Sequence, residues 1–270
     1  MYHHVSPSPG LVTVSPEMFA RQMEYIHRAG YETLSTDRFL AFLKGRGNVP
    51  AKSVLITFDD GYLDNFVHAF PVLKQYGLQA VIFLVTGWIG DGPTRSCASN
   101  FDGSTLPPTP DHRECKAAIR SGRADEVMLR WSEVKVMAAS GAVEFHSHTH
   151  RHIRWDHEYP DAAKRLGVLE ADLRESREVL HQRLGKPSVH LCWPWGCFDS
   201  SYQQLARNAG FEVQYTVAKG INVRGGNPEH VARVVVKDRS GFWFASRLWM
   251  YRHSLIGAAY ARLLRERDAG

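Results

Sequence analysis

The sequence predicts an α/β protein built as a single distorted (β/α) barrel with a C-terminal helix. Segments with strand character alternate with helical segments of about ten or more residues, a pattern typical of a parallel sheet. The strands are continuous apolar runs, such as AVIFLV at residues 80–85, which indicates burial on both faces of the sheet. A chain of 270 residues has the length of one such barrel.

The alternating elements begin at residue 53. A β-branched run predicts a strand over 53–57, and Phe66, Phe70 and Leu73 share one face of a helix predicted over 63–76. The elements that follow are strands at 80–85, 142–145, 189–193 and 212–217, and helices at 132–139, at 161–184 and after Asp199. A structureless loop is predicted over about residues 90–128, because prolines interrupt the alternation there, and we expect it to cover the functional site.

The C-terminal residues are predicted to form a helix that is aromatic at its start and then basic. Leu248, Leu255, Ala259 and Leu263 fall on one side of it. One interpretation is a terminal helix packed on the barrel. The alternative is an interfacial amphipathic helix that makes peripheral contact with an anionic membrane.

Composition excludes several classes of protein and one class of partner. A hydrophobic fraction of 44% and a charged fraction of 23% are those of a folded globular protein rather than a disordered chain. The net charge of +5 is not gathered into a basic run, so no nucleic-acid partner is expected. The four cysteines form no CxxC pair, and neither a signal peptide nor an apolar run of membrane-spanning length is visible. We expect a cytoplasmic protein, with membrane association as an alternative.

Polar residues follow the ends of three predicted strands, which is where (β/α) barrels carry their active sites. Asp59 and Asp60 follow the first, and Trp193–Gly196 follow a later one. Four histidines alternate over seven residues, from His146 to His152. Two imidazoles and one carboxylate are a recurrent ligand set for a catalytic divalent metal, with a structural metal site as the alternative. A spare carboxylate beside the metal points to hydrolysis, with a solvated turn as the alternative for the two acids.

These residues resemble the motifs of the polysaccharide deacetylase family, which has the NodB-homology fold of carbohydrate esterase family 4. Thr57-Phe-Asp-Asp resembles its first motif, and His148-Thr-x-x-His152 its second. The resemblance implies Asp59 as general base and Asp60, His148 and His152 as metal ligands. His146-Ser-x-x-His150 also fits the second motif, but the spacing from Glu144 favours His148 and His152. The deacetylase domain would span residues 1–240, and residues 241–270 would form a C-terminal extension.

The third motif departs from the family pattern. Cys192-Trp-Pro-Trp-Gly resembles R-x-P-x-G, but Cys192 stands where an arginine usually orients the base. Tyr2-His3 resembles the histidine motif of the circularly permuted members that act on poly-N-acetylglucosamine, although only Met1 precedes it. The resemblance implies His3 as general acid, and Arg233 is the candidate for the missing arginine, with an exposed strand charge as its alternative.

The resemblance implies a metal-dependent N-deacetylase that acts on an N-acetylated glycan or glycolipid of the cell envelope. The metal would be zinc, with cobalt and nickel as alternatives. The backbone N–H of Tyr62 would stabilise the oxyanion. The remaining candidate substrate contacts are Trp193, Pro194, Trp195 and Trp131, with packing in the core as the alternative for at least one tryptophan. An O-acetyl esterase and a catalytically inactive carbohydrate-binding module are the alternative functions.

Overall fold

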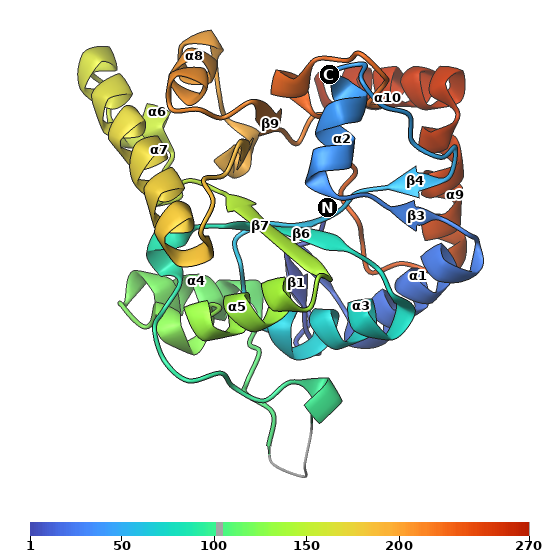
Figure 1. Ribbon diagram of the computed structural model, residues 1–270, viewed down its shortest axis with the longest axis horizontal. Coiled ribbons are helices and arrows are strands. Elements are labelled where there is room, and N and C mark those ends of the chain that lie inside the picture. Colours follow the sequence, from blue (N-terminus) through green and yellow to red (C-terminus); the bar gives the residue numbers. More distant parts are fainter. Residues whose placement is uncertain (101–104, 270) are drawn as a thin grey trace.

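Five short parallel strands curl into the wall of a barrel in the computed structural model, which describes residues 1–100 and 105–269 (Figure 1). Their order in the sheet follows the chain, and each pairs in parallel with the next. The strands are β5 (Ile56–Phe58), β6 (Ala80–Leu84), β7 (Val143–Ser147), β8 (His190–Cys192) and β9 (Val213–Tyr215). Two small parallel sheets flank this wall and pair β1 (His4–Val5) with β2 (Thr13–Val14), and β3 (Glu32–Thr33) with β4 (Ser53–Val54).

Irregular backbone pairing bridges the two edges of the five-stranded sheet. Val231 pairs with Tyr215 at the end of β9, and Tyr2 pairs with Phe58 of β5. Between these two segments, the N–H of Val236 donates to the carbonyl of Met1 at 3.1 Å. The predicted apolar segment 231–236 therefore lies between β9 and the N-terminal residues, and the wall closes through single hydrogen bonds rather than through long strands.

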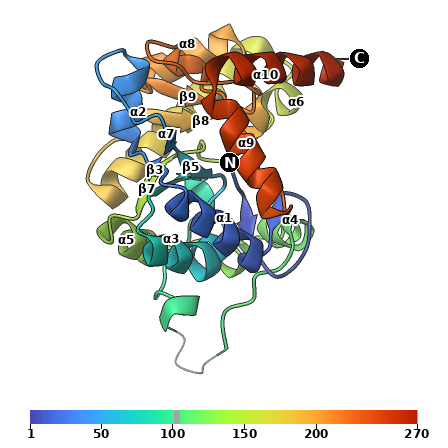
Figure 2. The same ribbon diagram turned by 90° about the vertical axis from the view of Figure 1, so that its right-hand side faces the viewer.

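Helices cover the outside of this wall, as the alternation of the sequence predicts (Figures 1 and 2). These helices cover the sheet with their apolar faces. In α1, for example, Phe19, Met23 and Ile26 are buried against the sheet. The helices of the barrel are α1 (Pro16–Arg28), α2 (Thr36–Leu43), α3 (Phe70–Tyr76), α4 (His112–Arg120), α5 (Trp131–Ala139), α6 (Trp155–Glu158), α7 (Ala162–Leu184) and α8 (Ser200–Asn208). A π-helix, η1 (Asn65–Ala69), leads into α3, so the helix predicted over 63–76 changes its winding partway.

Two expectations are corrected by the structure. The segment predicted as a structureless loop over about residues 90–128 contains α4, which Asp111 begins with a capping box. Proline and glycine before residue 111 concealed this helix, and residues 101–104 of the segment lie outside the described residues. The C-terminal helix is two helices, α9 (Gly241–Arg252) and α10 (Ser254–Ala269), because the backbone leaves the helical region at His253.

Helix α9 packs on the barrel, whereas α10 extends beyond it (Figure 2). Phe244 of α9 is buried in the main core cluster, and Trp243 and Leu248 are partly buried against the same cluster. The packed-helix interpretation of the sequence therefore describes α9. Among the described residues, the helices are all too short or too polar to span a membrane.

A buried histidine in the barrel makes stability depend on pH. Burial, and then the neighbouring His146, lower the pKa of His190 well below its ordinary value. His190 stays neutral in the folded chain while the unfolded chain takes up a proton below about pH 6.5. We expect the free energy of unfolding to fall by up to about 2 kcal/mol between pH 7 and pH 5 because of this residue.

The measurement is urea unfolding at both pH values for the wild type, for His190→Asn and for the exposed control His181→Asn. The wild type and the control should lose stability in parallel, and His190→Asn should lose less. An equal loss in all three proteins would contradict the prediction.

Candidate active site

Two carboxylates leave the end of β5 in different directions because the chain turns sharply there. Asp60 has a φ of +73° and Gly61 a φ of +86°, both in the left-handed region. A Cβ atom on Gly61 would lie 2.6 Å from Cδ2 of Leu84, so only glycine fits this turn without displacement. Asp59 and Asp60 are both almost fully buried. The turn therefore presents two adjacent carboxylates to two different sets of neighbours.

The loop after β7 brings two histidines to Asp60. Nε2 of His148 and Nε2 of His152 each lie 3.3 Å from Oδ1 of Asp60. One ligand atom from each of these three side chains lies within 4.8 Å of the other two. The other two histidines of the cluster point elsewhere: His146 contacts Ser188 and Thr36 inside the barrel, and His150 contacts Thr86 and Glu175.

A carboxylate from α7 holds this loop in place. Asp172 accepts hydrogen bonds from the backbone N–H groups of His150 and Arg151, at 2.8 and 3.1 Å, and from Nε of Arg151 at 2.9 Å. Within the loop, the N–H of His152 donates to the Thr149 hydroxyl at 3.2 Å. The side chain of Asp172 is fully buried, so these donors replace the water that its carboxylate would otherwise bind.

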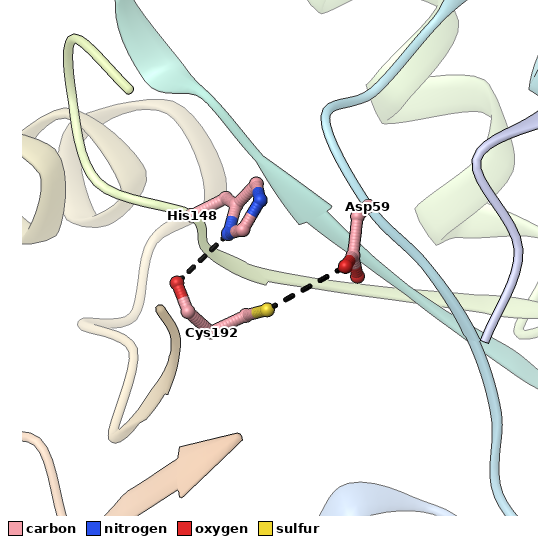
Figure 3. Close-up of side chains that lie close together, drawn as sticks. All are labelled: Asp59, His148 and Cys192. Atoms are coloured by element: carbon pink, nitrogen blue, oxygen red, sulfur yellow. Dashed lines mark hydrogen bonds between the residues drawn. The ribbon is translucent and has the colours of Figure 1, made fainter. Parts of the chain in front are cut away.

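The three converging side chains fit a divalent metal ion. Nδ1 of His148 lies 2.8 Å from the Cys192 carbonyl and donates to it, which turns the Nε2 lone pair toward Asp60 (Figure 3). Oδ1 of Asp60 is buried and has no hydrogen-bond partner. Acceptor atoms that face one another at this distance need a cation or a proton between them. Two imidazoles and a carboxylate suit zinc, cobalt and nickel alike.

The neighbours of this cluster control its charge. Burial alone would raise the pKa of Asp60, but His152 and His148 hold it well below its ordinary value. Burial alone would lower the pKa of His148, but Cys192 and Asp60 raise it well above that value. Without a metal, His148 therefore carries a proton, which a metal ion would displace on binding.

Asp59 is held by an arginine that lies 174 residues away in the sequence. Nη1 and Nη2 of Arg233 donate to the two carboxylate oxygens of Asp59 at 2.6 and 2.9 Å. Nη2 also lies 3.0 Å from Sγ of Cys192, and Nε donates to the Thr216 carbonyl. Burial alone would raise the pKa of Asp59, but Arg233 lowers it to about 2. Asp59 is therefore ionised at neutral pH.

The thiol of Cys192 completes a second cluster with Asp59 and His148 (Figure 3). It donates to Oδ2 of Asp59 at 3.7 Å. A metal ion bound there would have to displace the guanidinium of Arg233 from both partners. The cluster of Asp60, His148 and His152 is therefore the better metal site of the two. Arg233, the sequence-predicted candidate for the orienting arginine, thus lies against Asp59 and Cys192.

His3 lies beside Asp59, with its Nε2 atom 3.9 Å from Oδ2. Its position is set by both neighbours: Tyr2 pairs with Thr57 and Asp59 through its backbone, and His4 begins β1. Asn65 also donates to the His3 carbonyl at 2.8 Å. These backbone contacts place His3 beside Asp59. Burial lowers the pKa of His3, and the nearby Asp59 offsets part of that shift.

Aromatic side chains form the rim of the site. Trp195 is 54% exposed, and its ring centroid lies 5.2 Å from that of His152. The ring centroid of Trp88 lies 5.1 Å from that of the same histidine. The ammonium of Lys116, from α4, lies 4.7 Å from the Trp88 ring and 3.9 Å from Oδ2 of Asp60. Indole rings beside the cluster of Asp60, His148 and His152 can stack on the face of a bound sugar.

Three of the sequence-predicted substrate contacts are buried in the core. Trp193 is 1% exposed, and its indole N–H donates to Gln214. Trp131 is 3% exposed and belongs to the main core cluster at the start of α5. Pro194 is also buried. In this structure the three side chains pack inside the protein rather than facing solvent, which favours the packing alternative for both tryptophans. The side chain of Tyr62 is buried as well, so only its backbone could serve the site.

Sequence reasoning missed Asp172, Trp88 and Lys116. Asp172 lies within a charged helix where nothing distinguishes it from its exposed neighbours. Lys116 lies in the segment predicted to be a loop, so its helical position beside the metal cluster could not be inferred. Trp88 follows the predicted strand at 80–85 closely enough to have been recognised as a strand-end residue.

We expect Asp172→Ala to weaken divalent-metal binding by about 10- to 100-fold, because the histidine loop would lose three hydrogen bonds. The measurement is zinc affinity by competition with a chelating dye. Glu170→Ala, an exposed change on the same helix, is the matched control and should bind zinc as the wild type does. Equal affinity in Asp172→Ala and the control would contradict this role.

Comparisons with known proteins agree with this geometry. YxkH of Bacillus subtilis (strain 168), a candidate polysaccharide deacetylase, is 26% identical over 220 residues, which are 82% of this chain and 64% of YxkH. The poly-beta-1,6-N-acetyl-D-glucosamine N-deacetylase of Staphylococcus aureus (strain MSSA476) is 22% identical over 228 residues, 84% of this chain and 68% of that protein. The chain therefore spans about two thirds of the length of these relatives.

A solved structure has a similar fold. IcaB from Ammonifex degensii matches with a TM-score of 0.68 and 25% identity, over 93% of this chain and 94% of that one. This likeness confirms the predicted distorted barrel of NodB type. Residues 46–214, more than half of the chain, match the family model for polysaccharide deacetylases. The chain belongs to the polysaccharide deacetylase family.

Proposed function

We propose that this chain is a metal-dependent N-deacetylase that releases acetate from an N-acetylated amino sugar in a polysaccharide or a lipid-linked glycan. The proposal rests on two neighbouring features. One is the cluster of Asp60, His148 and His152, which fits a metal ion, and the other is the ionised Asp59 that Arg233 holds beside it. Family membership and the names of the relatives support it.

For a lipid-linked substrate, exposed apolar residues of α9 and α10 such as Phe242, Trp249 and Leu255 would contact the membrane.

Asp60, His148 and His152 would hold one divalent ion, which we propose to be zinc, with cobalt or nickel as substitutes. When bound, the ion supplies Lewis acidity that polarises a carbonyl group and acidifies water. The Cys192 carbonyl keeps Nε2 of His148 available as a ligand atom. The hydrogen bonds to Asp172 hold the loop that carries His152 in place.

Asp59 would accept the proton of the attacking water. The two hydrogen bonds from Arg233 keep its carboxylate ionised and fix its orientation. The backbone N–H of Tyr62 would donate to the oxyanion of the tetrahedral intermediate. His3 would protonate the leaving nitrogen, and burial helps because a lowered pKa makes the imidazolium a stronger acid. The products are acetate and a free amine.

We expect Asp59→Asn to reduce acetate release by about 10²- to 10⁴-fold while leaving metal content unchanged, because Asp59 acts as a base and not as a ligand. The substrates are N-acetylglucosamine oligomers, and acetate is measured by a coupled assay and metal by mass spectrometry. Asp60→Asn is the matched comparison, and it should lose both metal and activity. No acetate release by the metal-loaded wild type would refute the proposal, and release only from O-acetylated sugars would favour the esterase alternative.

We expect Trp195→Ala to raise KM for these oligomers by about 3- to 10-fold with little change in kcat, because an exposed indole beside His152 would stack on the bound sugar. Phe242→Ala, which removes a more exposed aromatic far along the chain, is the control and should leave KM unchanged. An unaltered KM in Trp195→Ala would exclude this stacking contact.

A further inference from the structure

A cavity lies between the barrel and α9. Its volume is about 450 Å³, within the range of about 300–1,000 Å³ typical of small-molecule sites. Residues from α1, α2 and β4 line it on one side, and the extended segment 231–236 and α9 line it on another. Helix α9 crosses this side of the molecule next to α1, as both views show (Figures 1 and 2). None of the metal-cluster residues lines this cavity.

The cavity wall is mainly aliphatic and aromatic. Representative lining residues are Ile26, Leu34, Phe39, Val54, Ile221 and Leu248. Such a surface binds hydrocarbon, because contact with it removes apolar area from water. The wall therefore selects an apolar ligand or the apolar part of a larger one.

The charged side chains of this wall all have the same sign. They are Arg233, Arg247 and Arg252, and the described lining residues include no aspartate or glutamate. Asp59 neutralises Arg233, so that guanidinium is not available to a ligand. Arg247 and Arg252 remain, and among the ion pairs of the described residues neither is joined to a carboxylate.

Both remaining arginines belong to α9. The Arg247 guanidinium lies over the rings of Trp243 and Tyr260, at 5.3 and 5.0 Å, which holds it against the helix surface. Arg252 ends α9 and is exposed. An anionic group in the cavity beside Arg247 and Arg252 would accept hydrogen bonds from guanidinium groups that are not paired with a carboxylate.

We propose that this cavity binds a single-chain anionic amphiphile, a fatty carboxylate, with its hydrocarbon chain among the apolar residues and its headgroup at Arg247 and Arg252. Two independent features support this occupant: the apolar wall selects the chain, and the unpaired positive charge selects the anion. A neutral hydrocarbon would leave Arg247 and Arg252 without an anionic partner, and a polar anion would leave the apolar wall unfilled. The cavity shares Arg233 with the proposed active site but none of the proposed metal ligands, and the test does not depend on enzymatic activity.

The experiment is isothermal titration of the full chain with decanoate and, in parallel, with the neutral 1-decanol. The wild type should bind decanoate at one site. The double variant Arg247→Gln/Arg252→Gln should weaken decanoate binding by about tenfold or more, because two charge-assisted hydrogen bonds are lost, and should bind decanol within about twofold of the wild type. Arg21→Gln/Arg174→Gln, which removes two exposed arginines outside the cavity, is the matched control and should behave as the wild type.

Val54→Trp tests the position of the hydrocarbon chain, because the larger side chain would fill part of the cavity. It should abolish binding of both ligands, and thermal unfolding shows whether the variant is folded. The arginine variant decides the question alone if Val54→Trp does not fold. No saturable decanoate binding by the wild type, or equal decanoate affinity in the two double variants, would overturn the proposal. Binding to phosphatidylglycerol vesicles without binding of decanoate would also overturn it, because it would indicate a surface contact.

Discussion

The buried ion pair between Asp59 and Arg233 is the constraint on which the rest of the site depends. It joins the end of β5 to the segment that closes the barrel. Removing either partner would leave an uncompensated charge in the interior, which typically costs about 3–5 kcal/mol. The same pair keeps Asp59 ionised and occupies the position beside Cys192 that could otherwise attract a cation. The contact that helps to close the barrel is therefore also the contact that keeps Asp59 ionised.

The metal cluster depends on a separate set of supporting contacts. The Cys192 carbonyl orients His148 from β8, and Asp172 anchors the loop of His152 from α7. Each ligand therefore has its direction determined by a different element, so the three ligand atoms converge only when the neighbouring strands and α7 are packed together.

The segment between β6 and α5 contributes more to the site than a covering loop would. Its helix α4 brings Lys116 over Trp88 and close to Asp60, and His112 against His4. A cation near the ligand carboxylate lowers the pKa of Asp60 further. A metal ion would compete with that ammonium for the same carboxylate, so the position of Lys116 and the occupancy of the metal site are coupled by charge.

The alternation of strands and helices could be predicted from the sequence, because the spacing of apolar residues reflects local geometry. The adjacent carboxylates and the histidine pair could be recognised as well, because each lies within a few consecutive residues. The sequence did not determine which aromatic residues face solvent: Trp193 and Trp131 are buried while Trp195 is exposed, and only packing separates them. The resemblance made Arg233 a candidate for the arginine that orients Asp59, but an exposed strand charge stayed open as its alternative, and nothing in the sequence indicated the support from Asp172. Those contacts join residues far apart in the chain, so they exist only once the barrel closes and excludes water from the charges.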